Sequence, residues 1–339
     1  MNYLPFFEKK QRYFILFVSE IIFRKADLMI YLAPLQGFTD YVYRASYAKV
    51  FNAVDAYFVP YISLKNNTIP NKYIREILPD NNGQNRVVPQ ILAKDAAEFK
   101  FLENILVENG YSEFNLNLGC PYPMVTNRGK GSGLLPFPDE IYKLLDYFYS
   151  SDKGELSVKL RAGFKSAHEL EAIIEVLNQF PLKEVILHAR VAGQLYSGEI
   201  DENAFAYATQ NLKHKLVYNG DIFSTEDFIA KQNKFPGIDT WMLGRGILMN
   251  PLLPHEIKGV QVSPQERFDL LNTFHQTMLK RYLEIMDNEG NALNKMKQFW
   301  IYFSRCFPNQ RKVLKHIKKV KSLNKYGEIV KSAFYENRG

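Results

Sequence analysis

Residues 156–190 read LSVKLRAGFKSAHELEAIIEVLNQFPLKEVILHAR, and this stretch contains one complete strand–helix–strand unit. Runs rich in β-branched and apolar residues cover residues 156–163 and 184–190, and a segment of helical character covers residues 167–179. Two strands that are joined through a helix pair in parallel within one sheet. The stretch therefore predicts a parallel sheet that is covered by helices.

The same unit repeats along the chain from Met29 onward. The strand runs are residues 29–34, 53–61, 87–92, 113–120, 156–163, 184–190, 215–221 and 239–246. The helical segments between them are residues 41–51, 71–78, 96–109, 139–149, 167–179, 202–211 and 225–232. Eight such units predict an α/β fold, a closed (β/α)8 TIM barrel over residues 29–258, with an open doubly wound sheet as the alternative.

A small helical domain is predicted over residues 263–339, with helices at 264–286, 294–307 and 310 to about 334. Positive charge is concentrated there. Residues 292–339 carry 12 Lys and Arg against two acidic residues, a net charge of +10, whereas the rest of the chain has a net charge of −3. This asymmetry indicates a polyanionic partner, and the alternative is a solvated basic helix without one.

The third helix of this domain would gather its basic side chains on one broad face. Arg311, Lys315 and Lys318 follow one another at i, i+4 and i+7, with Lys312 and Lys319 alongside. Phosphate contacts made by such a face give affinity and salt dependence rather than sequence choice.

Residues 1–28 are expected to be an extension outside the barrel. Either Met29 is the natural start, or the segment forms an amphipathic helix on the outside of the fold. Its apolar stretch is too short to span a membrane, and no small-x-small cleavage pattern follows it. Two cysteines rule out a disulfide framework and suggest a reducing compartment. We expect a cytoplasmic protein without a membrane partner, and nothing requires more than a monomer.

Polar side chains gather where the predicted strands end, and in a barrel these ends open on one face. Because polar groups buried within strands are costly unless they are paired, so many of them indicate a polar ligand. The residues, in chain order, are Pro34, Gln36, Gln90, Asn115, Asn117, Cys120, Lys159, Arg161, His188, Arg190, Asn219, Gly220, Asp221, Gly244 and Arg245.

The last two strand ends favour a phosphate group. In barrels, phosphate commonly binds at the loops after strands seven and eight, which here read Asn219-Gly-Asp and Gly244-Arg-Gly. Glycine permits close approach of the backbone, and Arg245 offers a fork of donors. The alternative is two ordinary tight turns.

The remaining donors and acceptors suit a flat heteroaromatic ring. Lys159 beside the pyrimidine side of a flavin would stabilise the negative charge of the reduced ring. A catalytic metal is not expected, because no His, Asp or Glu residues show the spacing of metal ligands. No dinucleotide-binding domain is visible, so a nicotinamide donor would enter the same mouth transiently.

Cys120 is the candidate acid. It precedes Pro121 at a strand end, so we expect it on a bent, exposed loop, where a largely protonated thiol could protonate a developing carbanion. A nucleophilic role stays open, although no histidine is close in sequence. Gly129-Lys-Gly-Ser-Gly is expected to form a flexible loop beside the site, with Arg128 and Lys130 available to a phosphate backbone.

Six segments together resemble the tRNA-dihydrouridine synthase family of bacterial type. They are Ala33-Pro-Leu-Gln-Gly-Phe-Thr-Asp, Asn117-Leu-Gly-Cys-Pro, Val158-Lys-Leu-Arg, Leu187-His-Ala-Arg, Asn219-Gly-Asp and Gly244-Arg-Gly. The resemblance runs from about Met29 to the C-terminus, and its most specific element is Asn-x-Gly-Cys-Pro. The chain departs from the family pattern at Gly131-Ser-Gly, where members usually read Gly-x-Gly-Ala, and near Ile200 and Asp201, where they often carry Asp-Trp.

This resemblance implies an FMN-dependent oxidoreductase that uses NADPH, or NADH, to reduce the 5,6 double bond of specific uridines in tRNA. It implies backbone contacts to the flavin from Pro34, Leu35 and Gln36. It implies FMN binding by Gln90, Lys159, His188, Asn219, Gly220, Asp221, Gly244 and Arg245. Asn117 and Arg161 would hold the uracil, Cys120 would donate the proton, and the basic helices, with Arg311, Lys315 and Lys319, would hold the tRNA.

Two other functions remain open at this stage. One is an FMN-dependent barrel oxidoreductase that acts on a free pyrimidine or another small molecule, without a role for the basic helices. The other is an RNA-binding protein on a barrel that has lost its activity.

Overall fold

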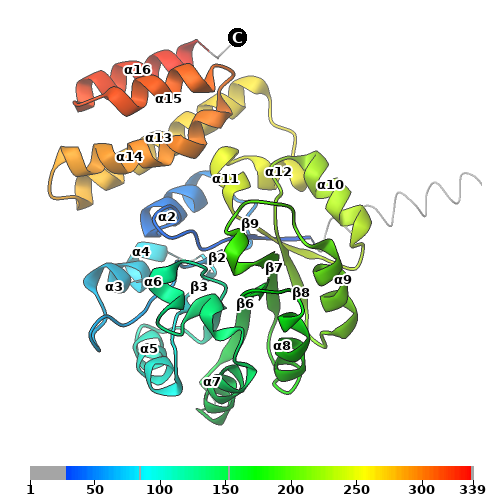
Figure 1. The fold of residues 1–339 in the computed structure, drawn as a ribbon. Coiled ribbons are helices and arrows are strands. Elements are labelled where there is room, and N and C mark those ends of the chain that lie inside the picture. Colours follow the sequence, from blue (N-terminus) through cyan, green and yellow to red (C-terminus); the bar gives the residue numbers. More distant parts are fainter. Residues whose placement is uncertain (1–27, 84, 152, 337–339) are drawn as a thin grey trace, which may run out of the picture.

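A computed structural model describes residues 28–83, 85–151 and 153–336, which form a barrel followed by a group of C-terminal helices (Figure 1). The extension predicted over residues 1–28 lies, apart from Leu28, outside the described residues. Among the helices that the structure describes, none combines the length and the apolar character needed to cross a membrane.

Parallel strands form a single sheet in the described chain. They are β1 (Met29–Leu32), β2 (Ala56–Phe58), β3 (Val87–Val88), β4 (Gln90–Ile91), β5 (Glu113–Leu118), β6 (Glu155–Gly163), β7 (Val185–Val191), β8 (Leu216–Asn219) and β9 (Thr240–Leu243). Their order in the sheet is β3-β2-β1-β9-β8-β7-β6-β5-β4. All eight predicted strand runs are confirmed, and the third is divided into β3 and β4.

Pro89 divides the third strand, because proline has no N–H to donate to a neighbouring strand. The two pieces nevertheless close the sheet: β3 pairs with β2, and β4 pairs with β5. The Pro89 carbonyl accepts a hydrogen bond from Asn115 N at 2.9 Å, and the Gln90 carbonyl accepts one from Ile62 N at 2.8 Å. The TIM barrel is confirmed, and the open doubly wound alternative is wrong.

Each of the seven helical segments predicted between the strands is confirmed, and these helices together with additional short ones surround the sheet. They are α2 (Tyr41–Val50), α3 (Asn71–Ile77), α4 (Pro79–Asn82), α5 (Ala96–Glu108), α6 (Pro123–Thr126), α7 (Pro138–Ser151), α8 (Glu169–Leu177), α9 (Glu202–Asn211), α10 (Thr225–Lys234), α11 (Arg245–Met249) and α12 (Leu253–Ile257). Short 3₁₀ turns, η1 (Gly131–Leu134) and η2 (Ala192–Gln194), lie in the loops after β5 and β7. Side chains of Asp40, Asp95, Asp201 and Ser224 cap α2, α5, α9 and α10.

The C-terminal helices are α13 (Pro264–Ile285), α14 (Glu289–Phe303), the 3₁₀ turn η3 (Ser304–Cys306), α15 (Gln310–Lys319) and α16 (Leu323–Tyr335). The single third helix predicted from residue 310 to about 334 is wrong. The chain turns extended at Val320, and the Ser322 side chain then caps a new helix by accepting from Lys325 N. Figure 1 shows α15 and α16 lying side by side beyond α13 and α14.

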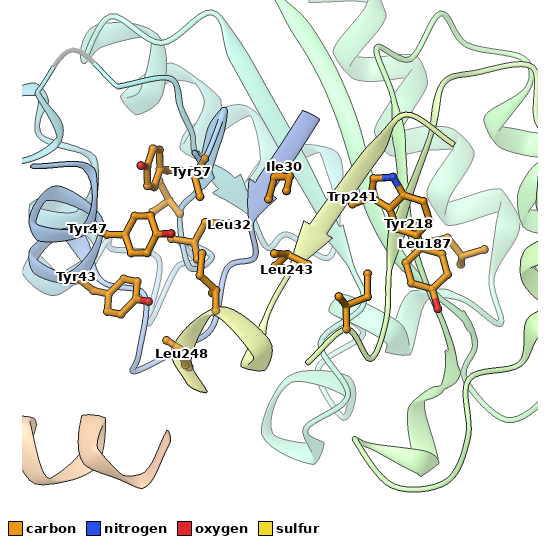
Figure 2. Close-up of a cluster of buried hydrophobic side chains, with 14 of the residues drawn as sticks. Ile30, Leu32, Tyr43, Tyr47, Tyr57, Leu187, Tyr218, Trp241, Leu243 and Leu248 are labelled. Atoms are coloured by element: carbon orange, nitrogen blue, oxygen red, sulfur yellow. The ribbon is translucent and has the colours of Figure 1, made fainter. Parts of the chain in front are cut away.

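Apolar side chains pack on both faces of the barrel strands. One cluster of apolar strand side chains fills the inside of the barrel, and it includes Tyr31, Phe58, Ile186, Val217 and Met242. The alternate strand residues face the helices, and Figure 2 shows Leu32 of β1 beside Tyr47 of α2, and Trp241 of β9 beside Tyr218 of β8.

The C-terminal helices share this outer core. Phe274 of α13 packs edge-on against Tyr43 and against Phe51, each with ring centroids 5.4 Å apart. Trp300 and Phe303 of α14 are fully buried in the same cluster. The helices are therefore fixed against α2 at the start of the barrel.

Candidate active site

Two adjoining cavities lie at the carboxyl ends of the strands. The larger holds about 810 Å³ of open space and the smaller about 440 Å³. Six residues line both cavities: Lys159 of β6, His188 of β7, and, from the segments that follow β1, β7 and β9, Pro34, Leu35, Tyr196 and Arg245. The larger cavity adds Gln36, Phe38, Tyr61, Asn117, Gly119, Cys120, Pro121, Tyr122, Arg161 and Tyr302, and the smaller adds Ala33, Asn219, Gly220, Asp221 and Gly244.

Strand register explains why these residues meet. In parallel strands, paired residues face the same side of the sheet. Asn117 of β5 pairs with Lys159 of β6, and two residues further along β6 Arg161 pairs with His188 of β7. His188 pairs in turn with Asn219 of β8. The polar strand ends predicted from sequence thus form one continuous layer inside the barrel mouth.

The cavity is electropositive, and burial sets the protonation of its side chains. Burial, with Arg161 nearby, lowers the pKa of Lys159 to about 7. Burial, followed by the charges of Arg161 and Lys159, lowers the pKa of His188 well below its usual range, so the imidazole is neutral at pH 7. A neutral ring can donate from one nitrogen and accept at the other.

Asp221 orients two arginines at the smaller cavity. Its carboxylate accepts from Arg190 Nη2 and from Arg245 Nη2, both at 2.6 Å. Burial alone would raise the pKa of Asp221, but the Arg190 and Arg245 guanidiniums outweigh it and hold the pKa below its usual range. Arg245 also lies over the Tyr196 ring, 4.7 Å from the centroid, which fixes its plane.

Arg161 holds the loops around the mouth. Its Nε donates to the Gly119 carbonyl at 3.0 Å, and Nη1 and Nη2 donate to the carbonyls of Val191 at 3.2 Å and Leu195 at 2.7 Å. Arg161 is 2% exposed and joins the turn before Cys120 to the η2 loop. The loop that carries Tyr196 is thereby held over the mouth.

Asn117 is fixed from two sides. Its Oδ1 accepts from Gly119 N at 3.0 Å and Cys120 N at 2.9 Å, and its Nδ2 donates to Gln90 Oε1 at 2.6 Å. The Gln90 amide in turn donates to Asn115 Oδ1 at 2.7 Å. This chain of amides orders the turn that carries the candidate acid.

Cys120 is buried at the wall of the larger cavity, so the prediction of an exposed loop is wrong. The turn at Ser132 packs against it: Ser132 N and Oγ donate to the Cys120 carbonyl at 3.1 and 2.9 Å. Burial raises the pKa of the Cys120 thiol. The thiol is therefore protonated at physiological pH.

Comparison with known proteins now gives a family. A model of the dihydrouridine synthase (Dus) family matches residues 31–337, which is most of the chain. The chain belongs to the dihydrouridine synthase family. The resemblance seen in the six sequence segments is confirmed, and the family consists of oxidoreductases.

Individual relatives are distant but consistent. The chain is 29% identical over 248 residues to a tRNA-dihydrouridine(16) synthase of Shigella flexneri, covering 68% of this chain and 76% of that protein. It is 29% identical over 221 residues to a tRNA-dihydrouridine(47) synthase of Candida albicans, covering 58% of this chain and 36% of that protein. The chain thus spans about a third of the fungal relative's length. Among solved structures, a morphinone reductase variant has a TM-score of 0.48 at 10% identity, covering 73% of this chain and 90% of that one.

Two residues that the sequence analysis expected to contact ligands have protein partners in the structure. Gln90 is 1% exposed and lines neither cavity, because both ends of its amide are bonded to Asn115 and Asn117. Lys130 is buried, with Nζ 2.6 Å from Glu98 Oε2 and 3.1 Å from Ser63 Oγ. Lys130 is not available to a phosphate backbone, and the predicted flexible loop is the packed turn η1. Arg128 is exposed beside it.

Sequence reasoning missed the aromatic side chains of the mouth. Phe38, Tyr61, Tyr122, Tyr196 and Tyr302 all line the larger cavity. Tyr196 lies in the stretch Ala192-Gly-Gln-Leu-Tyr-Ser-Gly, which follows a predicted strand. An aromatic residue in such a loop could have indicated a side chain at the barrel mouth. The place of Tyr302 at the mouth could not be predicted from the sequence, because it depends on how α14 docks.

The basic face predicted for this Dus chain lies away from the cavities. Arg311, Lys315 and Lys319 are exposed on α15, while Val313 and Ile317 of the same helix are buried as expected. In the described part of the chain, no group of three or more His, Cys, Asp or Glu side chains could hold a metal ion.

Proposed function

We propose that this protein is a tRNA-dihydrouridine synthase that reduces the 5,6 double bond of uridines in tRNA with FMN and NADPH, and that Cys120 is its proton donor. The observation that carries the proposal is the position of a buried, protonated thiol in the same cavity as Lys159, Arg161 and a neutral His188. Membership of the Dus family and the names of the relatives support the reaction class.

The donor set fits FMN. A phosphate in the smaller cavity could bind to the Arg245 guanidinium, which Asp221 already orients. It could also bind to the backbone at Gly220 and Gly244. At Gly220 a Cβ would lie 2.8 Å from the Tyr218 hydroxyl oxygen, so glycine is required beside this cavity. Lys159 and His188, which line both cavities, would bind the polar edge of the isoalloxazine ring. When bound and reduced, FMN supplies the hydride that is added to carbon 6 of the uracil.

Cys120 completes the addition by protonating carbon 5 of the same ring. Hydride at carbon 6 and a proton at carbon 5 together account for the two hydrogens that the product gains. The thiolate left behind is stabilised by the positive charges of Arg161 and Lys159. These charges stabilise the anionic thiolate and have little effect on the neutral thiol, so they assist the transfer of the proton to carbon 5.

Asn117 would hold the uracil beside the thiol. Its side-chain oxygen is already committed to the backbone of Gly119 and Cys120, so a base can meet only a donor hydrogen of Nδ2 that Gln90 leaves free. Arg161, with three backbone carbonyls as acceptors, has further N–H groups for a uracil carbonyl.

A uridine must leave the RNA stack to reach this buried cavity, because a stacked base cannot present its ring face to a flavin. The exposed basic face of α15 supports a tRNA substrate, since phosphate contacts would hold the RNA while one nucleotide enters the mouth. A free pyrimidine would make no use of that face.

The test compares substrates for the reduced, FMN-loaded protein without oxygen. We expect an unmodified tRNA transcript to reoxidise the flavin and to gain dihydrouridine, while free uridine and uracil reoxidise it far more slowly. Nucleoside analysis of tRNA from a strain that lacks the gene, mapped by position, identifies the uridine. Equal reoxidation by free uridine would support the small-molecule alternative, and a protein that binds no flavin would refute the proposal.

A further inference from the structure

One face of α14 lies on the loop between β1 and α2, which lines the catalytic cavity. Lys295, Gln298 and Tyr302 follow one another at i, i+3 and i+7 and therefore share this face. The loop, residues 33–40, contributes Pro34, Leu35, Gln36 and Phe38 to the cavity wall. Figure 1 shows α14 close to α2.

Lys295 fastens the loop to the helix. Its Nζ donates to the Gly37 carbonyl at 2.7 Å and forms an ion pair with Asp40 Oδ2 at 2.9 Å. Tyr282 of α13 donates to both oxygens of the same carboxylate, at 2.9 and 3.0 Å. The side chains of Lys295 and Asp40 are 18% and 17% exposed, so this is a largely buried connection rather than a surface ion pair.

Tyr302 reaches the cavity itself. Its ring meets Phe38 edge to face, with centroids 5.0 Å apart, and both rings line the cavity that contains Cys120. The loop backbone also approaches α14 closely at Gly37, because a Cβ added there would lie 3.4 Å from Gln298 Nε2. Tyr302 is half-buried, and part of its ring is open to the mouth.

We propose that this face of α14 is part of the catalytic site. Tyr302 and Phe38 form an aromatic wall against which a base of the RNA packs when the uridine enters the cavity, and Lys295 positions the loop that carries Phe38. The inference rests on the proposed function and adds to it: the C-terminal helices help to select the substrate at the cavity, besides holding the RNA on α15.

The physical reason is that single-stranded nucleotides bind largely by stacking on aromatic side chains. A nucleotide extruded from tRNA brings a neighbouring base to the mouth, whereas a free uridine has no neighbour. An aromatic wall at the mouth therefore favours RNA over free nucleosides without reading sequence.

The first test replaces Tyr302 in the FMN-loaded full chain by Ala, Leu and Phe. Reduction of bound flavin by NADPH is measured separately from reoxidation by tRNA, and tRNA affinity is measured by fluorescence anisotropy. We expect Tyr302→Ala and Tyr302→Leu to raise the KM for tRNA about tenfold, with flavin reduction unchanged. Tyr302→Phe keeps the ring and should stay close to wild type. Tyr207→Ala, at an exposed tyrosine on α9, is the matched control.

The outcomes separate the two proposals. If wild-type reduced enzyme is not reoxidised by tRNA, the proposed function fails. If wild type is reoxidised and Tyr302→Leu has the wild-type KM, only the aromatic wall is refuted. If Tyr302→Phe is as impaired as Tyr302→Leu, the ring is not the group that matters and the inference is also overturned.

Lys295 is tested as a positioning residue. We expect Lys295→Met to weaken FMN binding, measured by flavin fluorescence, and to raise the KM for tRNA, because the loop that lines the cavity loses its attachment. Lys295→Arg should restore much of both, and Lys143→Met, at an exposed lysine on α7, should change neither. Unchanged FMN affinity together with unchanged KM in Lys295→Met would overturn this part of the inference.

Discussion

The carbonyl oxygen of Cys120 accepts two hydrogen bonds from Ser132, one from the backbone N at 3.1 Å and one from Oγ at 2.9 Å. The candidate acid is therefore positioned by a turn twelve residues further along the chain. The neighbouring Gly131 has a φ of +59°, and a Cβ there would lie 2.8 Å from the Cys120 carbonyl oxygen and 3.0 Å from its Cβ.

Gly131→Ala should displace the thiol without harming the flavin site. The added methyl has no room beside the Cys120 backbone, so the acid must move, and a displacement of about 1 Å can cost about 100-fold in rate. We expect reoxidation by tRNA to slow by this order while flavin reduction by NADPH is unchanged. Gly129→Ala is the matched control: its φ is +64°, yet nothing lies within 4 Å of the added Cβ. Equal loss in both variants would mean that backbone strain, not contact with Cys120, is responsible.

The acid role of Cys120 predicts an alkaline limit on the tRNA-dependent step. Burial raises the thiol pKa, so the proton is present at neutral pH and is lost only as pH rises through that raised value. The reoxidation rate in wild type should fall on the alkaline side. Cys120→Ala should bind FMN and be reduced by NADPH but form little dihydrouridine. A Cys120→Ser protein that keeps the same alkaline limit would show that another group titrates.

Lys159 predicts a pH dependence of FMN affinity. Its pKa is about 7 without a ligand, because burial favours the neutral amine, and an anionic ligand favours the ammonium form. Binding above pH 7 therefore takes up a proton, and FMN affinity should fall as pH rises, by up to about tenfold per unit. Lys159→Met should bind FMN more weakly at pH 7 and lose this slope, and titration by flavin fluorescence would show it. A slope that persists in Lys159→Met would assign it elsewhere.

Strand-level features of the site were predictable from the sequence. The polar residues fall at the ends of consecutive apolar runs, and parallel register places Arg161 beside His188 and His188 beside Asn219. The carboxyl ends of parallel barrel strands open on one face, so these residues meet there whatever conformation the loops adopt. The division of the third strand also has a local cause, the missing N–H of Pro89.

Features that depend on packing between distant segments were not predictable. The burial of Cys120 comes from η1, and Lys130 is occupied by Glu98 on α5, a partner that no spacing rule relates to it. The position of Tyr302 at the cavity depends on the docking of α14. The residue types of these segments alone did not distinguish a packed turn from a mobile one.

The basic face of α15 predicts how binding of tRNA responds to salt. Arg311, Lys315 and Lys319 are exposed, and each phosphate that a protein neutralises adds roughly 0.7 to 0.9 to the slope of log affinity against log salt concentration. Replacing all three by Gln should weaken tRNA binding at low salt and reduce that slope by about two to three. The affinities should converge at high salt, because the lost term is electrostatic.

A triple replacement of Lys100, Lys143 and Lys213 by Gln is the control, since these lysines are exposed on the barrel and the net charge changes equally. If both triple variants flatten the slope alike, the total charge and not the face of α15 governs binding. An unaltered slope in the α15 variant would remove these helices from the RNA interface and leave the aromatic residues of the mouth to hold the substrate.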